Sequence, residues 1–467
     1  MKITKKIGVL IAIVAIVAIL LSGAQAADWN MWGKDAGHTS YTTDSVEPPL
    51  KVSWIFDLGF RSPGFGPVGP VASNNTVYTR GITVDGQNVS CPQNVQCNQN
   101  IQEWLFAIDA KSGELLWKYK ADWDIRGIAV FNDLVVVSDD MNIYALSNGA
   151  EKWRREIGSG DQPPIIYKNL VLSGQAFALS LENGSLIWKY EPELPSADET
   201  HLVNNWARPL AAGEDTVLLA VQSTQTYYTG PRVPTVAEPP KPGEPIPPEP
   251  LRNYSTIIFA LNAETGKEEW VKKIPFSIES APIISKGKFF IGSNGSVQAY
   301  LLEDGREVWR TVLPGFRKVE AVNDNLLFID DTALSMEDGK KAFTYESSLS
   351  SPSLAVSGNA LYIGGSSDSA VLETLNATTG ELIWRGVKVQ GYNSASKPVI
   401  SSDKLFLIAQ DGKLYAFSHG TPAESEKIGP IRDAPSLGTA LSILVLIGAF
   451  IINRRKKPTG LSTQKRL

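Results

Sequence analysis

Residues 105–117 read LFAIDAKSGELLW, and this stretch decides the fold. A short apolar strand leads into a turn, and a second strand that carries an aromatic residue follows it. A tight connection between antiparallel strands needs a residue at positive φ, which Gly113 provides because it has no Cβ. Strand side chains alternate between two faces, so Trp117 lies on a fixed face of the second strand. Its large area suits packing against a neighbouring unit.

The spacing of a glycine followed four residues later by an aromatic side chain recurs along the chain. The glycines are Gly113, Gly149, Gly184, Gly266, Gly305, Gly339 and Gly380. The aromatic partners are Trp117, Trp153, Trp188, Trp270, Trp309, Phe343 and Trp384. In most intervals the aromatic residue returns every 34–41 residues. Such self-similarity indicates a repeat protein, and its regularity favours a propeller over a single β-sandwich core.

The number of strands indicates how the ring closes. An apolar strand precedes a turn eight times, the last at residues 413–417, but the aromatic strand follows a turn only seven times. The eighth aromatic strand stands alone near the N-terminus, at Trp54. One unpartnered strand at each end fits a ring in which the N-terminal strand completes the last blade, which removes exposed strand edges. We predict an all-β, eight-bladed propeller of four-stranded blades over residues 47–420.

Two intervals between aromatic residues are too long for one blade. The 63 residues from Trp54 to Trp117 and the 82 residues from Trp188 to Trp270 predict insertions at about 81–103 and 192–256. The second contains residues 231–250, with nine prolines in twenty positions. Such a run cannot enter a sheet and is expected to be an extended arm, either a strap that binds a partner or a solvated loop.

Both ends of the chain combine a basic cluster with an apolar run. Three lysines, an apolar stretch and Ala24-Gln25-Ala26 predict a signal peptide over residues 1–26, with an uncleaved anchor as the alternative. A leader over residues 27–46 follows. After a linker at 421–436, the uncharged run predicts a transmembrane helix at 437–453 and a basic cytoplasmic tail at 454–467. A sorting signal that is removed on processing is the alternative for the C-terminus.

The net charge of −5 conceals a strong segregation of charge. Subtracting +3 for the N-terminal lysines and +6 for the C-terminal cluster leaves −14 on residues 27–436. So acidic a surface repels phosphate backbones and argues against nucleic-acid binding. Basic segments favour the cytoplasmic side of a membrane, which places the acidic propeller outside the cell.

Two further features agree with an external propeller. Cys91 and Cys97 are expected to form a disulfide that closes a small loop, because thiols oxidise outside the cytosol. Six sequons are candidate N-glycosylation sites: Asn74, Asn88, Asn183, Asn253, Asn294 and Asn376. With only three widely spaced histidines, a His-rich metal or catalytic centre is not expected.

Three copies of the repeat carry a family resemblance. Residues 107–117, 260–270 and 376–384 resemble the tryptophan-docking repeat of the quinoprotein propellers, the pyrroloquinoline-quinone-like repeat family. The stretch that opens WNMWGKDAGHT at Trp29 resembles the leader ahead of such propellers. The resemblance implies that each aromatic residue of the repeat, Trp54 included, docks onto an adjacent blade.

The resemblance implies two classes of function. The dehydrogenases of the family use a quinone, a disulfide between adjacent cysteines, a stacking tryptophan, a calcium ion and an aspartate base. Cys91 and Cys97 are not adjacent, and fold alone does not carry a site. The chain is therefore placed with the non-catalytic branch, which includes the bacterial outer-membrane assembly lipoprotein, although no lipidated cysteine follows the signal peptide. No catalytic residue, cofactor site or metal site is predicted.

We therefore expect a non-enzymatic, monomeric propeller, anchored in the cell membrane with its C-terminus cytoplasmic. It would bind other surface or secreted proteins through loops on one rim, as an assembly scaffold. Two alternatives remain open: an oxidoreductase that depends on pyrroloquinoline quinone and calcium, and a propeller that binds a glycan or small ligand in its central funnel.

Overall fold

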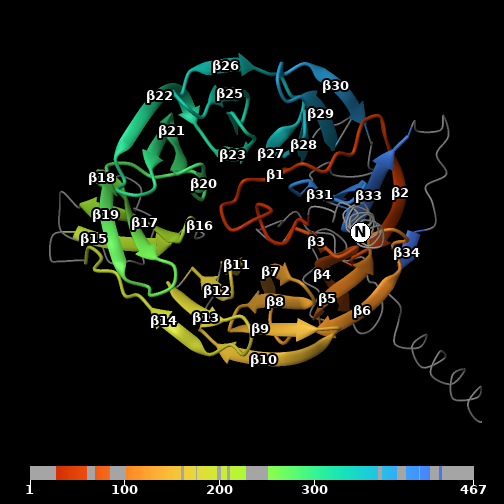
Figure 1. Ribbon diagram of the computed structural model, residues 1–467. Coiled ribbons are helices and arrows are strands. Elements are labelled where there is room, and N and C mark those ends of the chain that lie inside the picture. The colour runs from red at the N-terminus through yellow and green to blue at the C-terminus, as the bar shows by residue number, and fades with distance from the viewer. Residues whose placement is uncertain are drawn as a thin grey trace, which may run out of the picture.

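The computed structural model describes residues 28–59, 69–84, 101–158, 162–174, 176–196, 201–207, 211–227, 251–366, 371–386, 396–409, 411–420 and 431–433. All regular elements in these ranges are strands. They form eight sheets that follow one another around a central axis (Figure 1). The predicted all-β, eight-bladed propeller is confirmed.

Blades one to four follow one another along the chain, and in blades one to three the strands run in order from the axis to the rim. Their strands are β3 (Val71–Ser73), β4 (Thr76–Val84), β5 (Ile101–Asp109) and β6 (Leu115–Lys120); β7 (Ile125–Phe131), β8 (Leu134–Asp139), β9 (Asn142–Ser147) and β10 (Ala150–Glu156); β11 (Ile165–Tyr167), β12 (Leu170–Ser173), β13 (Phe177–Ser180) and β14 (Leu186–Lys189); and β15 (His201–Ala207), β16 (Ala211–Gly213), β17 (Thr216–Tyr227), β18 (Leu251–Asn262) and β19 (Glu268–Ile274).

Blades five to eight continue the ring. Their strands are β20 (Ile283–Ser285), β21 (Lys288–Leu301) and β22 (Glu307–Phe316); β23 (Val319–Val322), β24 (Leu326–Ile329), β25 (Thr332–Ser335) and β26 (Lys341–Thr344); β27 (Ser350–Ser357), β28 (Ala360–Ser366), β29 (Leu372–Asn376) and β30 (Leu382–Gly386), with β1 (Tyr41–Thr42); and β31 (Val399–Ser401), β32 (Lys404–Ile408) and β33 (Lys413–His419), with β2 (Leu50–Asp57) and β34 (Ile431–Asp433).

Blade five has three named strands where four were expected. The first part of β21 pairs with β20, as in Ile283↔Phe290, and its second part pairs with β22, as in Val297↔Thr311. Between the two parts the chain passes through Gly295, whose φ is 93°. One long strand therefore fills both middle positions of the blade.

Antiparallel pairing gives the ring two distinct faces. In blade one, β4 and β5 pair from Thr76↔Asp109 to Val84↔Ile101, so the tip of this hairpin lies at the opposite end of the blade from the turn at Gly113. We call the end with the short turns, such as that at Gly113, the turn face. The other end, with the tips of hairpins such as β4–β5 and β17–β18 and the linkers between blades, is the hairpin face.

The last blade joins the two ends of the described chain. β2 pairs antiparallel with β33 from Leu50↔His419 to Asp57↔Lys413, which confirms that an N-terminal strand closes the ring. Leu50 and Phe56 of β2 are fully buried in the core cluster of this blade. Residues 431–433, within the predicted linker, form β34, which pairs parallel with β2 and covers its outer edge.

An aromatic side chain of each of seven blades packs on a turn glycine of the next. Trp54 of blade eight donates a hydrogen bond from Nε1 to the carbonyl of Ala110 (3.0 Å), and a Cβ on Gly113 would lie only 2.7 Å from its ring. The other pairs are Trp117 with Gly149, Trp153 with Gly184, Trp188 with Gly266, Trp270 with Gly305, Trp309 with Gly339, and Phe343 with Gly380. All seven glycines have φ between 67° and 78°. Trp384 packs instead against the core shared by blades eight and one.

The leader is part of the interior of the ring. Figure 1 shows it, in red, crossing the centre. Trp29 is fully buried and exchanges two backbone hydrogen bonds with Ala72 of blade one. Inner-strand N–H groups of blades two, four, five, six and seven donate to leader carbonyls: Val130 to Asn30, Ala212 to Ala36, Ile284 to Gly37, Val322 to Thr39, and Val356 to Ser40. The leader therefore links six blades from the axis.

A buried polar cluster fixes the middle of the leader. Lys397 donates from Nζ to the hydroxyl of Ser40 and the carbonyl of Glu320, both at 3.0 Å, and pairs with the Glu320 carboxylate at 3.2 Å. His38 packs edge-on against Trp32, with ring centroids 4.7 Å apart. Burial, followed by the charge of Lys397, lowers the pKa of His38 to about 3, so this imidazole is neutral at ordinary pH.

Strand pairing continues into both predicted insertions. β4 and β5 enter the range 81–103, while β15, β16, β17 and the first part of β18 lie within 192–256. The extra length therefore starts as an extension of blade hairpins. Several predicted features lie outside the described residues: the signal peptide, Asn88, the disulfide between Cys91 and Cys97, the proline-rich stretch 231–250 and the helix 437–453. In the part of the chain that the structure describes, no helix is long and apolar enough to span a membrane.

Substituting Gly184 tests the contact between blades. Gly184→Ala places a Cβ 2.5 Å from the ring of Trp153 at a φ of 68°. We expect a loss of about 2–4 kcal/mol in the free energy of unfolding, from a left-handed backbone at ~1–2 kcal/mol and overpacking at ~1–3 kcal/mol. The matched control is Gly358→Ala, because Gly358 has a φ of 55° but open space around it. Equal losses for both variants in chemical denaturation would show that the aromatic contact adds nothing.

A second substitution tests whether the leader belongs to the fold. Trp29→Ala removes a fully buried side chain, so we expect a loss of about 3–5 kcal/mol. Trp123, 51% exposed between blades one and two, is the control, and Trp123→Ala should change stability by less than about 0.5 kcal/mol. A thermal midpoint for Trp29→Ala that matches the wild type contradicts an integral leader.

Candidate functional site

The hairpin of β17 and β18 extends beyond its blade on the hairpin face. Each strand has 12 residues, and the two pair along their whole length from Thr216↔Asn262 to Tyr227↔Leu251. The outer strand β19 stops pairing at Thr256↔Ile274. Residues 251–255 of β18 therefore have no strand on their outer edge among the described residues.

The linker into blade five packs against this extension. The sequence of β17 changes from apolar residues at 217–221 to QSTQTY at 222–227, yet several of these polar side chains are buried. Gln222 donates from Nε2 to the carbonyl of Ile278 at 2.7 Å, and Thr256 donates from its hydroxyl to the carbonyl of Phe276 at 2.8 Å. These bonds hold the linker beside the hairpin.

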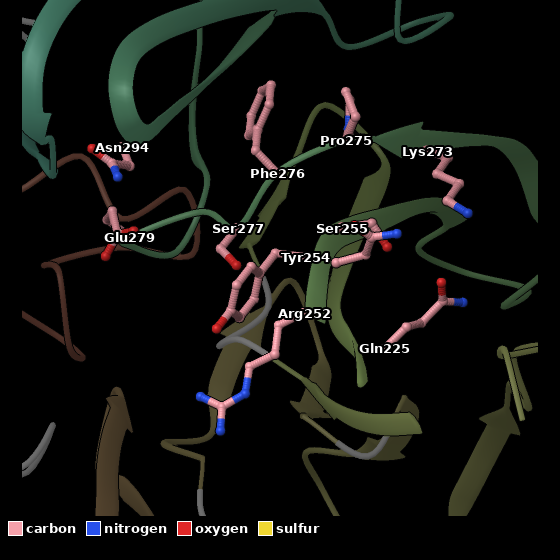
Figure 2. A pocket seen from close by; sticks show the side chains of 11 residues that line it. Gln225, Arg252, Tyr254, Ser255, Lys273, Pro275, Phe276, Ser277, Glu279 and Asn294 are labelled. Carbon is pink, nitrogen blue, oxygen red and sulfur yellow. The ribbon is translucent and has the colours of Figure 1, made fainter. Parts of the chain in front are cut away.

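A pocket of about 880 Å³ lies between the hairpin extension and the linker (Figure 2). This volume is typical of small-molecule clefts, at ~300–1,000 Å³. Its lining combines aromatic, cationic, carboxylate and amide side chains: Tyr254 and Phe276, Arg252 and Lys273, Glu279, and Gln225, Asn253 and Asn294. Ser255, Ser277 and Pro275 complete the lining.

The lining residues come from four segments, with Gln225 on β17 and Lys273 near the end of β19. Arg252 to Ser255 line the pocket consecutively, so the pocket follows the open edge of β18 and takes side chains from both of its faces. Figure 2 shows Phe276, Ser277 and Glu279 on the linker and Asn294 on blade five. Tyr254 remains 46% exposed.

The pocket is suited to binding a polar ligand. Arg252 and Lys273 form no ion pair with the carboxylates of the described residues, and both line the pocket. Amide side chains both donate and accept hydrogen bonds, and aromatic faces pack on flat apolar surfaces. The ionisable side chains of the lining are Arg252, Lys273, Glu279 and Tyr254.

The structure divides the sequons between the two faces. Asn253 and Asn294 line the pocket on the hairpin face, whereas Asn74, Asn183 and Asn376 lie in turns on the turn face. The predicted docking aromatics lie far from the pocket, with the exception that Trp270 is carried by β19 of the same blade. Sequence reasoning missed the pocket, and the signal that pointed toward it was the long interval from Trp188 to Trp270.

A second polar site lies at the other extended hairpin. Glu103 of β5 is only 6% exposed, and its carboxylate lies 2.9 Å from Nε of Arg80 on β4. The backbone N–H of Ile125, at the start of blade two, donates to the same carboxylate at 3.3 Å. Burial raises the pKa of Glu103 to about 7, against the opposing charge of Arg80.

Comparison with known proteins defines the family. The sequence model of the family described as outer membrane protein assembly factor BamB matches residues 45–232, 252–345 and 293–423. These matches cover most of the chain, which therefore belongs to this family of propellers with pyrroloquinoline-quinone-like repeats.

Two characterised relatives differ in what they do. The chain is 23% identical to outer membrane protein assembly factor BamB of Burkholderia pseudomallei over 412 residues, 82% of this chain and 92% of that protein. It is 22% identical to tetrathionate hydrolase of Acidithiobacillus ferrooxidans over 229 residues, 45% of this chain. The latter match spans only 41% of the hydrolase.

Solved structures share the fold at low identity. BamB from Moraxella catarrhalis has a TM-score of 0.52 and 15% identity, over 79% of this chain and 99% of that one. Quinohemoprotein alcohol dehydrogenase from Comamonas testosteroni has a TM-score of 0.57 and 14% identity, over 85% and 82%. Assembly factors and enzymes thus share this ring, and the fold alone does not separate them.

Two observations concern the calcium ion and the quinone that the dehydrogenases resembled by the repeat use. Within the described ranges, no three His, Cys, Asp or Glu side chains are grouped so that they could hold a metal ion. The leader, moreover, crosses the axis and binds the inner strands of six blades.

The raised pKa of Glu103 predicts a pH dependence of stability. Because the folded-state pKa of about 7 exceeds the ordinary 4.5, Glu103 stabilises the fold fully below pH 4.5 and loses this contribution as the pH rises through 7. We expect up to about 3 kcal/mol, at ~1.36 kcal/mol per pKa unit. Denaturation of the wild type and of Glu103→Gln from pH 4.5 to 8 measures it, since the glutamine variant lacks this titration. If the wild type instead becomes more stable than the variant as the pH rises, the ion pair with Arg80 outweighs the effect of burial on the Glu103 carboxyl group.

Proposed function

We propose that the chain is a non-enzymatic, membrane-anchored scaffold whose propeller lies outside the cell and binds other surface or secreted proteins. The observation that carries this proposal is the β17–β18 hairpin, which extends beyond its blade on the face where loops and linkers gather. Membership of a family described by an assembly factor supports it.

The end of the hairpin offers a contact of the kind that protein partners use. Leu251, the first residue of β18, is 63% exposed, and Arg252 lies beside it. Arginine and tyrosine side chains often contribute much of the binding energy of an interface, and Arg252 and the exposed Tyr254 lie on this strand, where Leu251 adds apolar area. The proline-rich stretch 231–250 adjoins this position in the sequence.

The proposed location follows from the acidic residues 27–436 between two basic, apolar ends. Protease treatment of intact cells tests it directly. We expect digestion of the propeller and survival of a membrane-bound C-terminal fragment. A propeller that is digested only after the cells are lysed contradicts the external location.

Substituting the hairpin tip tests partner binding. Leu251→Asp should reduce recovery of bound surface proteins in a pull-down from cross-linked intact cells at least ~10-fold, the equivalent of 1.4 kcal/mol. The matched control is Leu186→Asp, because Leu186 is 60% exposed on the outer strand β14 of blade three. A chain that lacks residues 231–250 is tested in parallel. If all three variants recover the same proteins as the wild type, the partner surface lies elsewhere.

A further inference from the structure

We propose that Asn253 and Asn294 carry N-linked glycans and that the first sugars of these glycans lie in the pocket between blades four and five. The proposal rests on the external location proposed above, because N-glycosylation of this kind takes place outside the cytosol. It assigns both a modification and an occupant to the pocket.

The first support is that the fold brings two sequons to one cavity. Asn253 lies on β18 of blade four and Asn294 on β21 of blade five, and both line the same pocket. Both side chains are exposed, and Asn294 lies in β21 beside Gly295, around which there is open space. Neither carboxamide has a hydrogen-bond partner among the described residues, so both amide nitrogens are accessible.

The sequons on the turn face differ in this respect. Asn74 donates from Nδ2, the atom that would carry a sugar, to the carbonyl of Asn132 at 3.3 Å. Asn183 accepts from the N–H of Ser185 at 2.9 Å. Asn376 accepts from the N–H groups of the two threonines that follow its neighbour, at 2.8 and 3.0 Å. The carboxamides of Asn183 and Asn376 hold turns and that of Asn74 bonds to the next blade, whereas the pair in the pocket makes no such bond with the described residues.

The second support is that the lining matches a sugar. A pyranose ring presents C–H groups on its faces and hydroxyl groups around its edge. Tyr254 and Phe276 offer aromatic surfaces for the faces, while Gln225, Glu279 and Ser277 offer donors and acceptors for the hydroxyls. On the neighbouring strand β17, Ser223 and Thr224 pair in register with Ser255 and Tyr254. The hydroxyls of Ser223 and Thr224 are buried and have no hydrogen-bond partner in the described part of the chain.

A glycan in this position would keep the edge of the hairpin from pairing with a strand of another chain. Among the described residues, no strand pairs with the outer edge of residues 251–255, and such an edge is a template for pairing with another chain. Sugars over Tyr254 would cover that edge with a bulky polar group and leave Leu251, at the tip, free for a partner.

The chemistry requires a separate transferase and an activated donor of the glycosyl diphosphate class. A bond forms between Nδ2 of the asparagine and C1 of the sugar, and the bond between C1 and the phosphate oxygen breaks. One proton leaves Nδ2, and the diphosphate departs with the electron pair of the broken bond. The propeller contributes only the acceptor amide and the pocket that receives the product.

Glycopeptide mass spectrometry of the full chain, purified from the membranes of its own cells, tests the modification. We expect a glycan mass on the peptides that contain Asn253 and Asn294. Asn253→Gln and Ser255→Ala should each abolish the first, because the second variant destroys the sequon but keeps the asparagine. Asn294→Gln should abolish the other, and Asn183→Gln is the control on the turn face. Unmodified peptides at both positions overturn the proposal.

The protease treatment of intact cells separates failure of this proposal from failure of the proposed location. A propeller that is digested in intact cells but carries no glycan overturns the glycan assignment alone. A propeller that is protected from the protease and unmodified overturns the external location as well.

The position of the sugars is tested by their reactivity with mild periodate, which oxidises vicinal diols. In the folded chain we expect several-fold slower oxidation of the first sugars than after denaturation. Tyr254→Ala should raise the rate in the folded chain, and Trp123→Ala should leave it unchanged. Glycans that react equally fast in the wild type, in Tyr254→Ala and after denaturation lie outside the pocket, which refutes their placement there.

Discussion

The packing of an aromatic ring in one blade on a glycine of the next is the contact on which the ring depends. A glycine at φ near 70° closes the turn tightly and, because it lacks a Cβ, lets the ring of the preceding blade lie directly on its backbone. A Cβ added at these glycines would lie between 2.5 and 3.3 Å from the ring, so the ring or the turn would have to shift. Seven such contacts lie on the turn face, so the lengths of the turns on that face are constrained.

The opposite face carries no equivalent constraint, and the chain varies there. β4, β17 and β18 lengthen toward the hairpin face while their other ends keep the register of an ordinary blade, as Thr76↔Asp109 and Thr216↔Asn262 show. Both extensions place polar side chains beside a linker to the next blade. One extension buries Glu103, whose pKa is raised, and the other forms the pocket beside Tyr254.

The repeat, the number of blades and the closing strand could be predicted because their signals are local. A glycine and an aromatic residue four positions apart mark one hairpin. The closing strand could be predicted because the aromatic strand at Trp54 has no turn before it and so completes the count of eight. The path of the leader could not be predicted, since its carbonyls bind N–H groups of six blades that are far apart in sequence. Likewise Asn253 and Asn294 were visible as sequons, but their meeting in one pocket depends on how blade four packs against blade five.

The leader also changes what the propeller can offer a partner or ligand. The inner strands of a propeller ordinarily have unpaired edges around an open axis. Here five of them donate a backbone N–H group to a leader carbonyl, from Val130, Ala212, Ile284, Val322 and Val356. Lys397 forms an ion pair with Glu320 and donates hydrogen bonds to the hydroxyl of Ser40 and the carbonyl of Glu320. Buried groups that are already satisfied gain little from a new ligand. The pocket between blades four and five instead presents cationic, amide and aromatic side chains at its surface, and recognition by this propeller is therefore expected there rather than at its axis.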